Sequence, residues 1–128
     1  MTYRQLTELI NMMILTAALK RCNKARGERL SRQYVDVLFC FYAFTMDKPK
    51  PLYHIPQRFL NILFAATAQE LKRRIDKLIE LGYVDKIETG RNRPKYVYQI
   101  TIAGINRINE MHAESKKLLK IAKKRLKS

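Results

Sequence analysis

Apolar residues recur at helical spacing through most of the chain. Between Tyr3 and about Lys24 they lie on one broad face, which predicts an amphipathic helix. A second helix is expected in "RQYVDVLFCFYAFTM", after Ser31 as N-cap, and "DKPKP" ends it because proline cannot continue a helix. Its expected core positions are Val35, Leu38, Phe39, Tyr42 and Ala43.

Two further helices follow in close succession. "LYH" is expected to be a short extended piece, and Pro56 suits the first turn of a helix "PQRFLNILFA", with Phe59, Leu60, Leu63 and Phe64 apolar. Thr67 and Glu70 have the spacing of a capping box, in which each side chain bonds the other residue's backbone N–H. The helix "AQELKRRIDKLIEL" then ends at Gly82, and its inward positions are Leu71, Ile75, Leu78 and Ile79.

The remaining pattern predicts a hairpin and a last helix. Residues 83–88 and 96–100 are rich in β-formers and flank a polar tip containing glycine. Thr101 is the expected N-cap of a helix from Ile102 toward Lys127, with Ile105, Ile108 and Met111 buried. We therefore expect one mainly α domain with a small β-hairpin.

The first helix is more apolar than one small domain can cover. Met12, Leu15 and Leu19 widen a face already formed by Leu6, Leu9, Ile10, Met13, Ile14, Ala17 and Ala18. Such a face predicts a partner, and we expect a homodimer built from the first and last helices.

Charge is the strongest compositional signal. The 128 residues contain 26 Lys and Arg against 11 Asp and Glu, a formal net charge of +15. This excess opposes folding by self-repulsion, so we expect a polyanionic partner, with nucleic acid ahead of an anionic membrane surface. The terminal run from Lys116 to Lys127 holds seven cations beside Leu118, Leu119, Ala122 and Leu126, which favours dimer packing with the cations outside.

Several protein classes are not indicated. No apolar run approaches the roughly 20 residues that span a bilayer, and "MTYRQLTELI" lacks the layout of a signal peptide, so a cytoplasmic protein is expected. Cys22 and Cys40 form no metal-binding spacing and are interpreted as free thiols, Cys40 in the core. With no nucleophile motif or phosphate loop, we expect neither an enzyme nor a cofactor.

The order of elements resembles a winged helix-turn-helix domain, and the flanking helices make it similar to the MarR family of dimeric regulators. The resemblance lies in "IPQRFLNILFAATAQELKRRIDKLIELGYV" and in "YQITIAG", and the tip "GRNRPKYVYQIT" is equally similar to PadR wings. It departs at Ala65, where the family's turn usually carries glycine, and at Asn92 and Pro94 in the wing. The matching apolar, capping and glycine positions are Leu60, Phe64, Thr67, Leu71, Ile75, Leu78, Gly82 and Val84.

The resemblance implies a division of the chain and a binding surface. It assigns residues 1–26 to an N-terminal dimerisation helix, 55–82 to the helix-turn-helix, 83–100 to the wing and 102–127 to a C-terminal helix. The fourth helix would enter the major groove of double-stranded DNA and the wing the minor groove. The implied contacts are Thr67, Gln69, Lys72, Arg73, Lys77, Arg91, Asn92, Arg93 and Lys95.

Alternatives to these assignments stay open. A solvated helix face also explains the polar residues of the fourth helix, and Arg74 lies nearer its buried stripe. His54 beside Tyr53 is compatible with a small-molecule effector, although no residue pattern supports one. The leading hypothesis is a dimeric transcriptional regulator associated with the nucleoid when DNA-bound. The alternative is a basic architectural or replication and recombination accessory protein of low sequence specificity.

Overall fold

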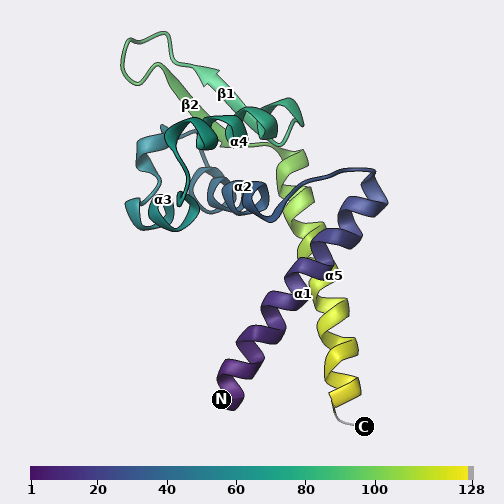
Figure 1. The fold of residues 1–128 in the computed structure, drawn as a ribbon. Coiled ribbons are helices and arrows are strands. Elements are labelled where there is room, and N and C mark those ends of the chain that lie inside the picture. Colours follow the sequence, from purple (N-terminus) through teal and green to yellow (C-terminus); the bar gives the residue numbers. More distant parts are fainter. Residues whose placement is uncertain (127–128) are drawn as a thin grey trace. The chain divides into compact units, whose positions relative to one another are not determined.

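The structure is a computed structural model that describes residues 1–126, apart from the side chains of Arg58, Ile62, Leu63 and Leu126. The expectations for Leu63, Leu126 and Lys127 therefore lie outside the described residues. The elements, in chain order, are α1 (Tyr3–Arg26), α2 (Arg32–Thr45), a 3₁₀ turn η1 (Leu52–His54), α3 (Gln57–Leu63), α4 (Ala68–Glu80), β1 (Val84–Glu88), β2 (Tyr96–Ile100) and α5 (Ile102–Leu126) (Figure 1). The predicted class, mainly α with one hairpin, is confirmed.

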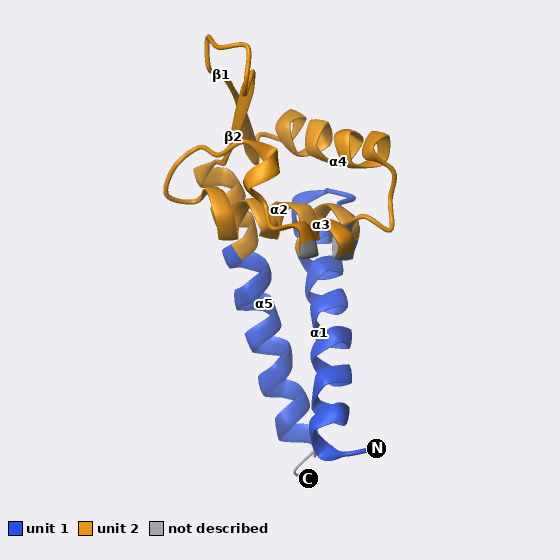
Figure 2. Cartoon of the chain, turned by 90° about the vertical axis from the view of Figure 1, so that its left-hand side faces the viewer, with its two compact units in different colours: residues 1–32, 109–128 blue, residues 33–108 orange. Residues whose placement is uncertain are grey.

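The chain divides into two compact units. Unit 1 contains residues 1–32 and 109–128, and unit 2 contains residues 33–108 (Figure 2). The helix-turn-helix and the wing implied by the resemblance both fall in unit 2.

Unit 1 is an antiparallel pair made of α1 and the C-terminal part of α5, which run side by side (Figures 1 and 2). Two ion pairs join them: Arg21 Nη1 lies 2.8 Å from Glu114 Oε1, and Arg26 Nε lies 2.7 Å from Glu110 Oε2. The buried apolar residues of this unit are Ala18, Leu19, Cys22, Leu30 and Met111.

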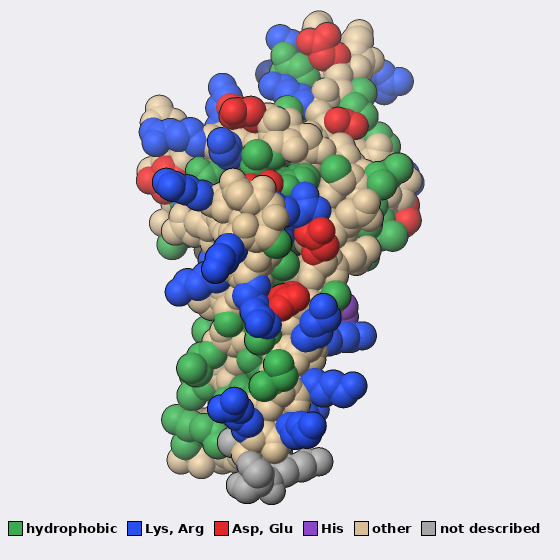
Figure 3. Space-filling view, turned by 90° about the vertical axis from the view of Figure 1, so that its right-hand side faces the viewer, with side chains coloured by type: hydrophobic (Ala, Val, Ile, Leu, Met, Phe, Trp, Pro, Cys, Tyr) green, Lys and Arg blue, Asp and Glu red, His purple; other side chains and the backbone are tan. Residues whose placement is uncertain are grey.

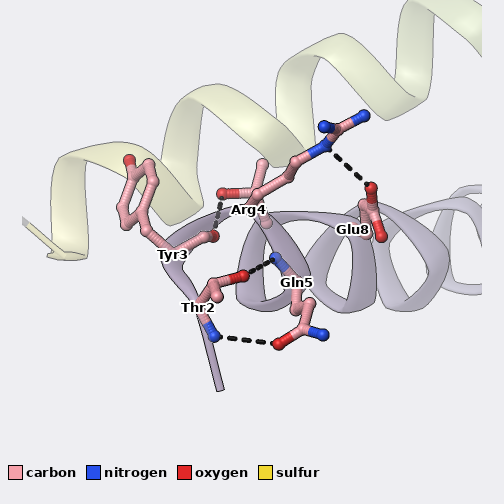
Figure 4. Close-up of polar contacts among 6 residues, drawn as sticks. Thr2, Tyr3, Arg4, Gln5 and Glu8 are labelled. Atoms are coloured by element: carbon pink, nitrogen blue, oxygen red, sulfur yellow. Dashed lines mark hydrogen bonds and ion pairs between the residues drawn. The ribbon is translucent and has the colours of Figure 1, made fainter.

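α1 begins with a capping box that the sequence analysis missed. The Thr2 hydroxyl accepts a hydrogen bond from the Gln5 backbone N–H at 3.2 Å, and Gln5 Oε1 accepts one from the Thr2 N–H at 2.9 Å (Figure 4). The Thr-x-x-Gln spacing that identifies such a box is present in "MTYRQ". α1 ends at Arg26, and Gly27 follows as the C-cap with φ +66°.

The core of unit 2 forms where α2 meets α4 and the hairpin. Leu38 and Phe41 of α2 are at most 1% exposed, as is Leu78 of α4. Two predicted core positions on α2 are wrong, because Phe39 and Ala43 are exposed. The segment "VLFCFYAF" is apolar all round, so its periodicity cannot select the inward face. Phe39 instead stacks on the half-buried Tyr42, with ring centroids 6.4 Å apart.

The hairpin pairs β1 with β2 antiparallel, from Val84 opposite Ile100 to Glu88 opposite Tyr96. Lys50 adds a bridge on the other edge of β2, where its backbone N–H and C=O bond Tyr98 at 3.0 and 2.9 Å. The extended piece is therefore at Lys50, and the prediction for "LYH" is wrong because these residues form η1. Pro56 lies at the N-cap of α3, one residue before the predicted position.

The connections around the hairpin are closely specified. Gly82, with φ +81°, follows α4, and the N–H groups of Gly82 and Tyr83 bond the carbonyls of Ile79 and Leu78, the pattern of a Schellman cap. Thr101 caps α5 as predicted, because its hydroxyl accepts from the Gly104 N–H at 3.0 Å. The same hydroxyl donates to the Gly82 carbonyl at 2.6 Å, which ties the end of α4 to the start of α5.

Candidate nucleic-acid interface

α4 presents one polar face because its opposite face is buried. Ile75 and Leu78 are 4% and 0% exposed, and Leu71 and Ile79 are half-buried. The Thr67 hydroxyl accepts from the Glu70 backbone N–H at 3.2 Å and so fixes the start of the helix. Only this half of the predicted capping box is present among the described contacts; the Glu70 carboxylate turns instead toward Arg74, 3.9 Å away.

The polar face contains every predicted contact residue of the helix. Gln69, Lys72, Arg73 and Lys77 are all exposed, and Thr67 is exposed at the N-terminal end. At about 100° per residue, residues 69, 72, 73, 76, 77 and 80 lie on a common side of the helix. The side chains that sequence reasoning selected are thus brought together on a single surface.

Charge is not uniform along this face. Asp76 and Glu80 lie on its C-terminal half, and Glu80 Oε1 is 3.9 Å from Lys77 Nζ. These carboxylates repel phosphate, whereas the cations Lys72 and Arg73, one turn from the N-terminus of α4, attract it. The N-terminal half of α4 is therefore the part suited to an anionic ligand.

Arg74 has the structural role that its position near the buried stripe suggested. It is 8% exposed, and its Nη2 donates to Gln33 Oε1 at 3.2 Å. Because Gln33 lies on α2, this contact holds α4 against α2 rather than facing outward.

The turn before α4 is formed without glycine. Phe64 is the C-cap of α3, and Ala65 and Ala66 make the bend that leads to Thr67. Among the described residues only glycines have positive φ, so Ala65 avoids the left-handed conformation that is costly for alanine. Ala65 therefore fits this turn without backbone strain.

The wing tip is organised by Thr89, a residue that sequence reasoning did not select. Its hydroxyl accepts from the Arg91 backbone N–H at 3.2 Å and donates to the Pro94 carbonyl at 2.5 Å. The sequence contained the signal for this contact, because a threonine hydroxyl commonly accepts a hydrogen bond from the backbone N–H two residues later and so forms a local turn. Figures 1 and 2 show the hairpin extending away from the helices of unit 2. The predicted contacts at its tip, Arg91, Asn92, Arg93 and Lys95, are all exposed.

The base of the wing is fixed to α2. The Thr45 hydroxyl, 1% exposed, accepts from the Ile100 backbone N–H at 3.0 Å, and the rings of Phe41 and Tyr98 lie 5.8 Å apart. Burial raises the pKa of Tyr98, and the charge of Asp76 raises it further, so its hydroxyl stays protonated at neutral pH. The tip is therefore exposed on a stem with a defined attachment.

A further cation on the wing was also missed. Lys86 on β1 is exposed, and its Nζ lies 4.0 Å from the centroid of the Tyr96 ring, with Lys95 Nζ at 5.3 Å from the same ring. Tyr96 thus holds two ammonium groups near one another by cation–π attraction. Strand alternation gave no signal for Lys86, because it places Lys86 on the same face as the buried Val84; Lys86 is exposed because all of β1 after Val84 is exposed.

An apolar hollow of about 470 Å³ opens between η1, α3 and the start of α4. Tyr53 lines it but His54 does not; the two rings meet edge to face, with centroids 4.8 Å apart. The hollow is lined by Leu52, Tyr53, Gln57, Leu60, Asn61, Phe64, Ala66, Ala68 and Leu71.

Other chemistry is limited within the described part of the chain. Residues 1–126 contain no group of three or more His, Cys, Asp or Glu side chains placed to hold a metal ion. None of the helices described combines the length and the apolar character needed to cross a bilayer. Burial raises the pKa of the Cys40 thiol to about 11, with a smaller contribution from Asp36, so this thiol is a packing group.

Comparison with known proteins supports the fold. No protein-family model matches the sequence, and no curated protein matches it. The transcriptional regulator Tm0710 from Thermotoga maritima is similar in structure, with a TM-score of 0.67 at 16% identity over 97% of this chain and 80% of that one. RV1404 from Mycobacterium tuberculosis gives 0.66 at 12% identity over 94% and 74% of the two chains. The predicted MarR-like winged-helix fold is confirmed.

Proposed function

We propose that this protein is a DNA-binding transcriptional regulator that uses α4 in the major groove and the wing at the minor groove. The observation that carries the proposal is the placement of two exposed basic elements, the N-terminal half of α4 and the wing tip, in one compact unit. The structural similarity to a transcriptional regulator supports the same function. A buried helix face and a fixed wing stem hold both elements on rigid supports, as groove recognition requires.

The two elements have different tasks under this proposal. Gln69 lies in the first turn of α4 and can pair bidentately with adenine, so it reads sequence. Lys72 and Arg73 hold phosphates and position the helix without carrying sequence information. Arg91 and Arg93 meet the electronegative minor groove, assisted by Asn92 and Lys95. Lys77 contributes less than these, because the Glu80 carboxylate, 3.9 Å from its ammonium group, partly neutralises its charge.

A pair of variants tests this division of labour. Arg91→Ala with Arg93→Ala removes two cations that release counterions from DNA. It should weaken binding to every duplex and flatten the plot of log affinity against log salt by about two units. Gln69→Ala should reduce discrimination among sequences and leave the slope unchanged, because an uncharged side chain releases no counterion. The wing assignment fails if the double variant keeps the parent's affinity and slope.

The sequence specificity of the protein is tested separately. Selection of bound sequences from a random duplex library should yield a pseudo-palindromic site bound at least about 10³-fold more tightly than random DNA. A weakly specific accessory protein would yield no such site. Thr67→Ala, which removes the α4 cap, should lower affinity for the selected site by loosening the start of the reading helix.

We further propose that a second copy of this chain covers the apolar face of α1. Four large apolar side chains on this face are between 45% and 71% exposed, and leaving them in water is unfavourable. They are Leu6, Leu9, Met12 and Met13. A dimer would also match the two half-sites of a palindrome. Sedimentation should show a dimer at micromolar concentration.

A substitution within that face provides the control. Leu9→Glu with Met13→Glu should yield a monomer, whereas Asn11→Glu, which is exposed on the opposite side of α1, should leave the dimer intact. A parent protein that sediments as a monomer would contradict this assignment.

A further inference from the structure

Most of the positive charge of this protein lies outside the winged helix. The sequence of unit 1 contains 14 Lys and Arg against four Glu, and that of unit 2 contains 12 against seven Asp and Glu. Unit 1 thus has a net charge of +10 and unit 2 only +5. The unit that contains α4 and the wing has the smaller excess, so the proposed DNA site does not account for the charge of the chain.

Half of the excess of unit 1 lies in residues 109–128, which contain seven Lys and Arg against two Glu, and five of these cations lie on one side of α5. Lys116, Lys117, Lys120, Lys123 and Lys124, here named the lysine face, are all exposed. At about 100° per residue they occupy an arc of roughly 120°. Leu118, Leu119 and Ala122 lie on the opposite side and are half-buried. Figure 3 shows basic side chains gathered along one side of the paired helices of unit 1, with apolar side chains on the other.

The described part of unit 1 offers the lysine face few carboxylates. Lys117 lines a hollow together with Glu110 and Glu114, but these two carboxylates are paired with Arg26 and Arg21, and residues 115–128 contain no acidic residue. No hydrogen bond or ion pair of these five lysines is seen among the described residues. Their mutual repulsion therefore destabilises unit 1 unless an external anion is bound.

Two ordinary explanations do not cover this arrangement. Cations at a helix C-terminus interact favourably with its dipole, but that effect falls off within the last turn and leaves Lys116, Lys117 and Lys120 unexplained. A helix lying in a membrane surface inserts its apolar side, usually with aromatic anchors. On α5, Leu118, Leu119 and Ala122 are half-buried, Ile121 alone in residues 116–125 is an exposed large apolar side chain, and residues 102–126 contain no Phe, Tyr or Trp.

We propose that the lysine face is a second, sequence-independent contact with the phosphate backbone of double-stranded DNA. The five ammonium groups extend over about 12 Å of helix at 1.5 Å per residue, and duplex DNA carries one phosphate charge per about 1.7 Å. Lysine acts as a point charge without the fork that reads guanine, so this contact adds affinity rather than specificity. Once the winged helix is bound, nearby phosphates are at high effective concentration, which favours the second contact.

Salt dependence measures the contact directly. Replacing the five lysines with glutamine, which has a similar helix propensity, should lower the slope of log affinity against log salt by roughly three to four units. Replacing them with arginine should keep the slope. A charge-matched control, Arg4, Lys20, Lys24, Arg29 and Lys48 changed to glutamine, should lower the slope by less. An unchanged slope in the lysine-face variant, or an equal fall in the control, would overturn the proposal.

The same measurements separate this proposal from the function proposed above. If the lysine face binds DNA and the wing does not, only the glutamine variant loses slope. If the wing binds and the lysine face does not, only the Arg91→Ala, Arg93→Ala variant loses slope. Additive losses in the combined variant support both contacts.

Two further assays identify the anion. Capture of a labelled duplex by a second, bead-bound duplex through the parent protein, lost in the glutamine variant, would show that the lysine face holds another DNA segment. If the glutamine variant has a reduced salt slope but the parent protein does not capture a second duplex, the lysine face contacts the same duplex as the winged helix. The second assay measures binding of the protein to vesicles with about one-third anionic lipid. If the glutamine substitutions abolish vesicle binding and leave the DNA slope unchanged, the lysine face belongs to a membrane and the proposal is wrong.

Discussion

The hydroxyl of Thr45 joins α2 to the last residue of β2 and so determines how firmly the wing is attached. It accepts from the Ile100 N–H at 3.0 Å and donates to the Phe41 carbonyl at 2.7 Å. The Tyr98 N–H, two residues earlier on β2, donates to the Lys50 carbonyl. The N–H groups of Tyr98 and Ile100 therefore lie on the edge of β2 that faces away from β1. Thr45→Val keeps the shape of the side chain and leaves the Ile100 N–H without its partner.

The magnitude follows from burial. Thr45 is 1% exposed and Ile100 is 5% exposed, so water does not replace the lost acceptor. An unsatisfied buried N–H costs about 1–3 kcal/mol, and the added methyl group recovers up to about 0.8 kcal/mol. We expect Thr45→Val to lower the free energy of unfolding by about 1–2 kcal/mol.

A matched control isolates the contribution of the Ile100 contact. Thr7 also donates to the carbonyl four residues before it, at 2.9 Å, but it is exposed and accepts from no strand. Thr7→Val should change the free energy of unfolding by less than about 0.5 kcal/mol. Urea unfolding at one fixed protomer concentration compares the two variants, because the proposed dimerisation would make stability concentration-dependent.

Hydrogen exchange gives a local readout of the same bond. The Ile100 amide should exchange faster in Thr45→Val than in the parent protein, by more than the change in global stability allows. Equal losses of stability in Thr45→Val and Thr7→Val, together with unchanged exchange at Ile100, would refute the reasoning.

Two other substitutions follow from local geometry. A Cβ on Gly104 would collide with the Tyr83 carbonyl oxygen and lie 2.7 Å from Ile100 Cγ1, so Gly104→Ala should destabilise by about 1–3 kcal/mol in urea unfolding, whereas the exposed Asn106→Ala should not. The raised pKa of Cys40, about 11, means that the unfolded thiol ionises first as pH rises, so stability is retained below about pH 8.5 and falls from there toward pH 11. Unfolding curves across that range should fall more steeply for the parent than for Cys40→Ala, and parallel curves would contradict the role of this thiol.

Local sequence signals determined the order and ends of most elements. Thr67 and Thr101 hydroxyls find backbone N–H groups three residues on, and Gly82 supplies the positive φ after α4, because each of these depends on neighbours in the chain. The polar face of α4 was predictable for the same reason, since helical periodicity separates it from Ile75 and Leu78. The exposure of Arg91 and Arg93 followed from the turn chemistry of the wing tip.

Features that depend on distant residues were decided only by the tertiary structure. Periodicity could not choose the inward face of α2, where every side is apolar, and packing placed Phe41 inside and Phe39 outside. The bridge of Lys50 to Tyr98 and the bond from the Ile100 N–H to Thr45 join residues about fifty positions apart, so no local pattern encodes them. The sequence by itself determined which side chains share a helix face or a turn. Tertiary packing decided which of those faces is buried and where the wing is attached, because burial is a property of the whole fold.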